Sequence, residues 1–168
     1  MRQMRRLFSI FMILQMHLIL LSANEHFLLP DQKSDLIYSL KSKIKRAEHI
    51  TLFTSHLHSS QMNKAIEKAI SRGATLQLIT TDMQSAAVYA KYRDTEVFVP
   101  SATERPGSFS IHLLLIDESD LCVASLPFDE EILRRENGIV TCSTDKEEIA
   151  FAQRLRALYT TRFEPYNP

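Results

Sequence analysis

The sequence has no excess of either charge. Its 20 basic and 20 acidic residues cancel, which excludes a polycationic protein that binds nucleic acid through charge alone. Apolar residues make up 45% and charged residues 24% of the chain, a balance that excludes a disordered chain, a collagen and a small disulfide-stapled scaffold. No internal repeat or low-complexity segment is present. With 168 residues, the sequence predicts one globular domain, or one domain with a tail.

An apolar run long enough to span a bilayer is also missing. A bilayer-spanning helix needs about 20 apolar residues, whereas the N-terminal run covers residues 7–21 and includes Gln15 and His17. Three arginines precede this run and Ala23 follows it, an order typical of a secretory signal peptide. We expect residues 1–23 to be a cleaved signal peptide, with an uncleaved membrane anchor as the alternative.

Both alternatives place the rest of the chain outside the cytoplasm. The protein would be periplasmic or secreted, or anchored by its N-terminal segment, and it would contact a membrane only in the anchored case. No cysteine follows the apolar run, which argues against a bacterial lipoprotein.

Cysteine is scarce, with two residues in the whole chain. No CxxC or Cys/His spacing indicates zinc, so the sequence predicts no metal site, and nothing in it indicates a cofactor. Cys122 and Cys142 each lie in an apolar, strand-like segment. They are either two small buried side chains or, in an exported protein, a disulfide. A disulfide requires their Cα atoms to lie within about 7 Å.

The spacing of apolar residues predicts alternating helices and strands. We expect helices at 34–47, 59–72, 84–93 and 145–163, and strands at 49–54, 74–80, 95–99, 109–116, 121–125 and 138–143. Residues 24–33 are expected to form a polar lead-in and 127–137 a charged excursion. This order predicts an α/β sandwich with a mixed sheet, in one domain over residues 34–168.

Several local patterns resemble one half of a phospholipase D superfamily protein. Residues 50–56 (ITLFTSH) match a hydrophobic strand that runs into a Ser/Thr-rich turn, and Arg72-Gly73 matches the step into the family's second strand. The stretch 110–117 (SIHLLLID) corresponds to the family's HxKxxxxD motif, and Glu136-Asn137 to a later Glu-Asn pair. The resemblance covers roughly residues 33–165. It implies a phospholipase D-like α/β sandwich, with a mixed β-sheet flanked by helices on both faces.

The HxKxxxxD motif is degenerate in this chain. With Asp117 aligned on the family aspartate, Ser110 takes the place of the nucleophilic histidine and His112 that of the lysine. Ser125 and Glu136 keep the family residue type. Phosphodiester cleavage needs an in-line nucleophile, an acid for the leaving group and cationic donors for the phosphate oxygens. The replacements therefore indicate a decayed catalytic motif.

The resemblance leaves several roles open for these residues. His112 has three possible roles. It is a catalytic candidate if it acts as a relocated nucleophile; otherwise it binds a ligand without chemistry or is a packed polar residue. Asp117 either orients catalytic partners, as in the family, and is then a catalytic candidate, or it simply begins a turn. Ser110, Ser125 and Glu136 are candidates for binding a ligand.

Two further histidines follow the strand expected at 49–54. His56 and His58 would lie at the sheet edge where the family's sites form, and with His112 they could make a phosphate or metal site. Loop histidines are mostly solvated, so we predict no metal here and keep His56 as a candidate for binding an anion.

These features together predict an exported phospholipase D-like domain that binds a phosphate-bearing ligand without cleaving it, or that has a structural role. One alternative is an active phosphodiesterase, a nuclease or phospholipase, with His112 as the nucleophile. That alternative requires a homodimer, because the family's single-motif members pair two chains to bring two motifs together. A second alternative is a generic exported α/β interaction protein.

Overall fold

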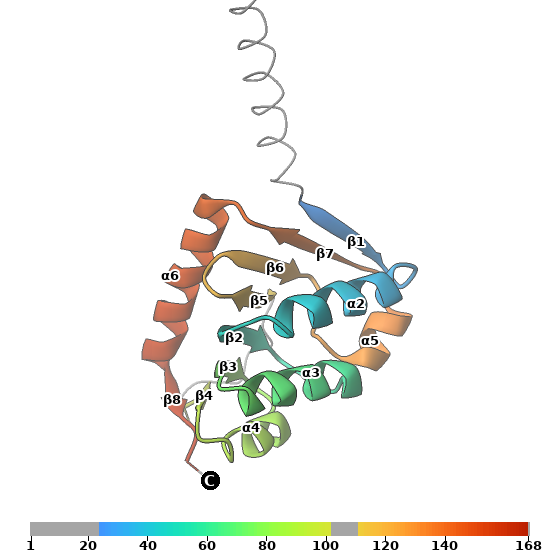
Figure 1. The fold of residues 1–168 in the computed structure, drawn as a ribbon. Coiled ribbons are helices and arrows are strands. Elements are labelled where there is room, and N and C mark those ends of the chain that lie inside the picture. Colours follow the sequence, from blue (N-terminus) through green and yellow to red (C-terminus); the bar gives the residue numbers. More distant parts are fainter. Residues whose placement is uncertain (1–23, 102–110, 168) are drawn as a thin grey trace, which may run out of the picture.

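The structure, a computed structural model, describes residues 24–101 and 111–167 (Figure 1). The expected signal peptide or anchor and the candidate residue Ser110 lie outside the described residues. Among the helices that are described, none has the length and apolarity that a membrane span requires.

The described chain contains eight strands and five helices. The strands are β1 (Glu25–Leu29), β2 (His49–Thr54), β3 (Thr75–Thr80), β4 (Thr95–Pro100), β5 (His112–Ile116), β6 (Asp120–Ala124), β7 (Gly138–Ser143) and β8 (Phe163–Pro165). The helices are α2 (Lys33–Ile44), α3 (Ser60–Ser71), α4 (Met83–Tyr89), α5 (Glu130–Arg135) and α6 (Lys146–Arg162).

All eight strands form one mixed sheet in the order β1-β7-β6-β5-β2-β3-β4-β8. Strands β2, β3 and β4 are parallel and are connected through α3 and α4, whereas β5, β6 and β7 follow one another as antiparallel neighbours. The two halves meet where β5 pairs antiparallel with β2. This arrangement confirms the predicted mixed sheet.

Helices cover both faces of the sheet, as predicted. Figure 1 shows α6 on one side of the sheet and α2, α3 and α5 on the other. Each face has its own apolar cluster: Leu52, Ile66 and Leu114 belong to the larger one under α2 and α3, and Leu113 and Ile149 belong to the smaller one under α6. Alternate residues of β5 therefore point into different layers, and the strand is buried on both sides.

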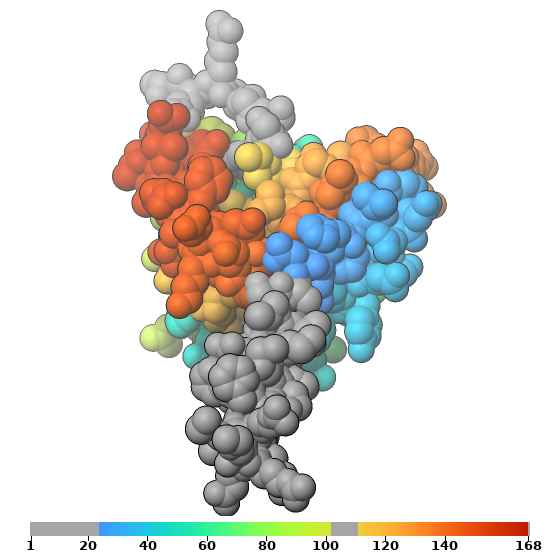
Figure 2. Space-filling model, turned by 90° about the horizontal axis from the view of Figure 1, so that it is seen from above, coloured from blue at the N-terminus to red at the C-terminus, as the bar shows by residue number. Residues whose placement is uncertain are grey.

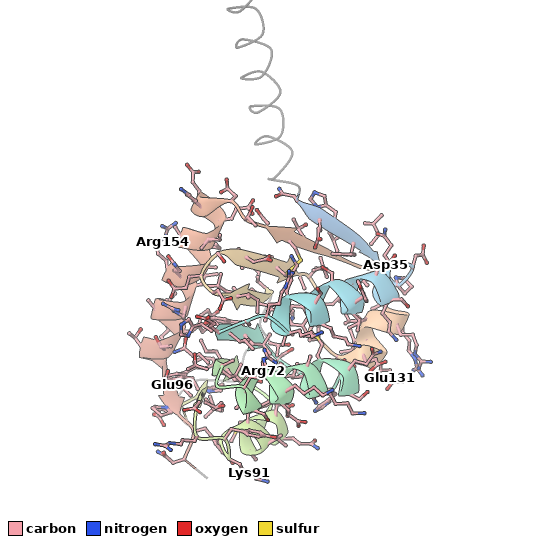
Figure 3. The ribbon with its side chains drawn as sticks, in the orientation of Figure 1. Asp35, Arg72, Lys91, Glu96, Glu131 and Arg154 are labelled. Atoms are coloured by element: carbon pink, nitrogen blue, oxygen red, sulfur yellow. A yellow bond between two sulfur atoms is a disulfide. The ribbon has the colours of Figure 1, made fainter. Side chains whose placement is uncertain are left out.

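The surface carries charges of both signs on many elements. The charged side chains labelled in Figure 3 are exposed and come from helices, strands and loops. They are Asp35, Arg72, Lys91, Glu96, Glu131 and Arg154. This mixture agrees with the balanced composition.

Three short elements escaped the sequence prediction. Strand β1 lies within the expected polar lead-in and pairs antiparallel with β7, and Figure 2 shows this N-terminal segment in blue beside the orange one. Its apolar side is small, since only Phe27 and Leu29 are buried. Helix α5 lies within the expected charged excursion and buries only Leu133. Strand β8 takes the last expected helical residue, Phe163, into the sheet beside β4.

The two cysteines form a disulfide between neighbouring strands. Cys122 and Cys142 are direct partners in the β6–β7 register, and their Cα atoms are 4.0 Å apart. Both are at most 2% exposed and belong to the larger core cluster. Of the two alternatives from the sequence, the structure contains the disulfide.

Removing this disulfide should lower the free energy of unfolding. The bridge closes a loop with a sequence separation of 20 residues, which corresponds to about 3 kcal/mol in the chain-entropy treatment. We expect the Cys122→Ala/Cys142→Ala variant to lose about that amount in urea unfolding monitored by circular dichroism. Wild-type protein made under oxidising conditions should release no thiol when it is unfolded without reductant. Thiols that react with Ellman's reagent in that sample would contradict the bridge.

Candidate functional site

The sheet brings four strand ends together at one edge. Parallel β2 and β3 end there, β5 begins there because it is antiparallel to β2, and β6 ends there because it is antiparallel to β5. We call this the carboxyl edge, formed by residues 54–58, 80–82, 112 and 124–129. In open α/β sheets, ligands bind outside the carboxyl ends of the strands, where the strand order reverses.

His112 is the first residue of β5 and lies inside this edge. It pairs with Ala124 of β6, and only 3% of its surface is exposed. Its side chain points to the same face as Leu114, as the period-two alternation predicts. The backbone N–H of Ser55 donates to the Nδ1 atom of His112 at 3.4 Å. A neutral ring that accepts at Nδ1 carries its proton on Nε2.

The surroundings of His112 favour its neutral form. Burial, assisted by the electrostatic influence of His56, lowers the pKa of His112 to about 4. Burial has this effect because a charged imidazolium loses its hydration in the protein interior. Near neutral pH, His112 is therefore an uncharged hydrogen-bond donor through Nε2.

His56 and His58 follow β2 in the loop before α3. Both side chains are exposed, and their ring centroids are 5.9 Å apart. Thr54 fixes the loop, because its hydroxyl donates to the carbonyl of His56 at 2.6 Å and accepts from the backbone N–H of Phe128 at 3.3 Å. The structure thus brings the candidate His56 to the same edge as His112.

Two carboxylates that were not among the predicted site residues contact His58. The Nε2 atom of His58 lies 3.0 Å from Oδ2 of Asp82, and its Nδ1 atom lies 3.5 Å from Oδ2 of Asp129. Asp82 and Asp129 are the N-cap residues of α4 and α5. Aspartate before a helical segment is a recognisable N-cap signal, but the contact with His58 is tertiary and has no signal in the sequence.

Hydrogen bonds hold Asp82 in its charged form. Burial alone would raise the pKa of Asp82. The hydrogen bonds from the Ser85 hydroxyl and the Gln84 backbone, together with the nearby His58, outweigh burial and lower the pKa below its usual value. The ring of His58 therefore lies beside a carboxylate that stays ionised and is fixed in position by its helix cap.

Ser125 and Glu136 also lie toward this edge, with different surroundings. Ser125 follows Ala124, the strand partner of His112. Its hydroxyl accepts from the backbone N–H of Ile139 at 3.0 Å, so it extends the pairing of β6 with β7. Glu136 is an exposed residue at the C-terminal end of α5.

Asp117 lies at the opposite edge of the sheet. It follows the last residue of β5, and five residues of extended strand span about 17 Å. Its Oδ1 atom accepts from the backbone N–H groups of Glu48 and His49 at 2.8 and 2.7 Å. Its φ of 51° places it in a tight turn. The structure thus joins Asp117 to the β2 entrance and separates it from His112.

Comparisons with known proteins identify the fold but no close relative. No family model matches the sequence, and no curated protein matches it significantly. Among solved structures, NucT from Helicobacter pylori has a TM-score of 0.76 at 20% identity, over 86% of this chain and 99% of that one. Nuc from Salmonella typhimurium, a phospholipase D family member, has a TM-score of 0.69 at 10% identity, over 88% and 99% of the two chains.

A larger protein shares the same architecture. Phosphatidylserine synthase from Haemophilus influenzae has a TM-score of 0.67 at 9% identity, over 86% of this chain and 40% of that one. The whole described domain is therefore matched in proteins whose sequences differ at most positions. The chain has the fold of the phospholipase D superfamily.

Proposed function

We propose that this protein is an exported domain of phospholipase D fold that no longer cleaves phosphodiesters and binds a phosphate-bearing ligand at the carboxyl edge. The fold supports the expected position of the site, and the degenerate motif supports the loss of cleavage. Ser110 occupies the nucleophile position by alignment, and a serine hydroxyl needs a neighbouring base to become a nucleophile.

The state of His112 is the observation that carries the proposal. A histidine nucleophile must offer a free lone pair, but the Nδ1 lone pair of His112 faces the Ser55 N–H and its Nε2 atom carries the proton. What remains is a neutral N–H donor, which can bind a phosphate oxygen but cannot attack phosphorus.

The neighbouring groups suit binding better than cleavage. His56 is exposed beside His112 and can present a second imidazole to a ligand. The carboxylates of Asp82 and Asp129 lie against His58. This edge therefore offers imidazole donors for a phosphate, without a lysine in the family position.

Purified protein should show no phosphodiesterase activity in the presence of a chelator. The substrates are bis-p-nitrophenyl phosphate and DNA, and the expected rate equals that of buffer, because loss of one member of a catalytic set typically costs several orders of magnitude. Inorganic phosphate, titrated by calorimetry in chelator-free buffer, should bind, and His56→Gln should weaken this binding while His26→Gln should not. Chelator-resistant cleavage that His112→Ala abolishes would instead establish His112 as a relocated nucleophile.

The low pKa of His112 predicts a specific acid sensitivity. Between pH 6.5 and about 4, the unfolded state takes up a proton at His112 that the folded state does not. Stability therefore falls as the pH is lowered through this window. At 1.36 kcal/mol per pKa unit, the loss is roughly 3 kcal/mol. In the His112→Gln variant, the free energy of unfolding measured in urea should therefore fall by about that much less between pH 7 and 4 than it does in the wild type.

The matched control for the acid experiment is His26→Gln. His26 is exposed and contacts Thr141 through its ring, so its replacement should leave the pH dependence of the wild type in place. Each variant is compared with itself across pH, which removes any constant destabilisation caused by the substitution. An identical slope in the wild type and His112→Gln would contradict a depressed pKa at His112.

Export is supported by the disulfide and by the order of features in residues 1–23. Disulfides persist in oxidising compartments outside the cytoplasm. Cell fractionation and N-terminal sequencing should find the protein outside the cytoplasm with a new N-terminus near Ala23. An intact Met1 in the membrane fraction would select the anchored form, and an intact Met1 on a soluble cytoplasmic protein would contradict export.

A further inference from the structure

Three side chains at the carboxyl edge present metal-binding atoms to one another. One ring nitrogen from each of His56 and His58 and one carboxylate oxygen of Asp82 all lie within 4.8 Å of one another. They come from the loops that follow the parallel neighbours β2 and β3. We propose that His56, His58 and Asp82 bind a divalent transition-metal ion, and that Zn²⁺ is the ion this ligand set suits.

The spacing of the ligand atoms fits a tetrahedral zinc site. Bonds of 2.0–2.1 Å at tetrahedral angles place ligand atoms about 3.3 Å apart. The Nε2 atom of His58 and Oδ2 of Asp82 are already 3.0 Å apart. The ligand nitrogen of His56 lies within 4.8 Å of both atoms, on an exposed loop side chain, so completing the site requires His56 to move closer.

Asp129 supplies a second and independent indication of a metal. Histidines that bind metals almost always donate their other ring N–H to a carboxylate, a carbonyl or a water molecule. Asp129 faces the Nδ1 atom of His58 at 3.5 Å, on the side of the ring away from Asp82. With a metal bound at Nε2, the proton of the neutral ring would lie on Nδ1, where Asp129 is placed to accept it.

The helix caps orient both carboxylates before any metal binds. Asp82 accepts from the Gln84 backbone and the Ser85 hydroxyl, and Asp129 accepts from the backbone N–H groups of Glu131 and Ile132. The side chains of Asp82 and Asp129 are only 10% and 12% exposed. A site whose ligands are fixed in advance loses less entropy on binding.

The ligand types select the class of metal. Two imidazoles and one carboxylate suit Zn²⁺ and its neighbours among the first-row transition metals, whereas Mg²⁺ and Ca²⁺ prefer sites made of oxygen atoms. Three protein ligands leave the fourth position of a tetrahedral ion open to water. The signal in the sequence was weak because His-x-His is followed by its third ligand only at Asp82, a spacing that matches no zinc motif.

The test measures metal binding directly and needs no phosphate ligand. The protein is expressed with its own N-terminus and without a polyhistidine tag, stripped with chelator, and titrated with Zn²⁺ in phosphate-free buffer against a chromophoric chelator. We expect one Zn²⁺ per chain and no competition from Mg²⁺ or Ca²⁺ in excess. Co²⁺ should bind in place of Zn²⁺ and give the visible absorption of a tetrahedral complex.

Matched variants assign the site to its residues. Loss of an outer hydrogen-bond partner typically weakens metal binding by roughly 10–100-fold, and we expect a loss of this size for Asp129→Asn. Loss of a direct ligand should weaken Zn²⁺ binding by more than this in each of three variants: His56→Gln, His58→Gln and Asp82→Asn. Asparagine caps helices as well as aspartate does, so both Asp→Asn variants should keep their circular dichroism spectra. His49→Gln is the control, because His49 is an exposed histidine at the opposite end of β2.

Some results would overturn the proposal. If His49→Gln weakens Zn²⁺ binding as much as His58→Gln does, the metal binds to scattered surface histidines. If the Co²⁺ complex lacks tetrahedral absorption and still forms in Asp82→Asn, this ligand set is excluded. If His58→Gln does not fold, Asp82→Asn and Asp129→Asn decide the question. A protein that binds Zn²⁺ but not phosphate would refute the proposed function and leave the metal site in place.

Discussion

The antiparallel pairing of β5 with β2 is the constraint on which the candidate site depends. It places the first residue of β5 beside the last residues of a parallel strand, so that polar groups far apart in the sequence meet at one edge. If β5 ran parallel to β2, the two ends of β5 would change places. His112 would then lie at the opposite edge, and Asp117 would lie at the carboxyl edge. The same pairing buries β5 between two helical layers, which is why an imidazole at its start loses its hydration.

Local periodicity explains how much of this could be predicted from the sequence. The alternation of residues 111–116 placed His112 correctly because a strand repeats every two residues. Helices α2 and α3 were predicted because each buries a stripe of apolar residues at helical spacing. Strand β1 has only two buried side chains, too few to give a pattern. The contacts of His58 with two helix caps come from separate loops, so they depend on the packing of α4 and α5 rather than on spacing in the chain.

Asp117 shows where a motif can be misleading. A sequence motif groups residues by their spacing, but residues at the two ends of an extended strand cannot share one site. Its carboxylate instead binds the backbone at the start of β2, which fixes the register of β5 against β2. A residue with this role preserves the geometry of the site without touching a ligand.

The direction of β1 determines how the protein would face a surface to which it is tethered. Glu25 pairs with Cys142 and Leu29 with Gly138, so β1 starts at the edge that contains Asp117 and ends at the carboxyl edge. The chain therefore enters the domain on the side opposite His56 and His112. If the N-terminal segment stays in a membrane, this direction turns the site away from the bilayer, toward solutes rather than toward the headgroups of the lipids around the anchor.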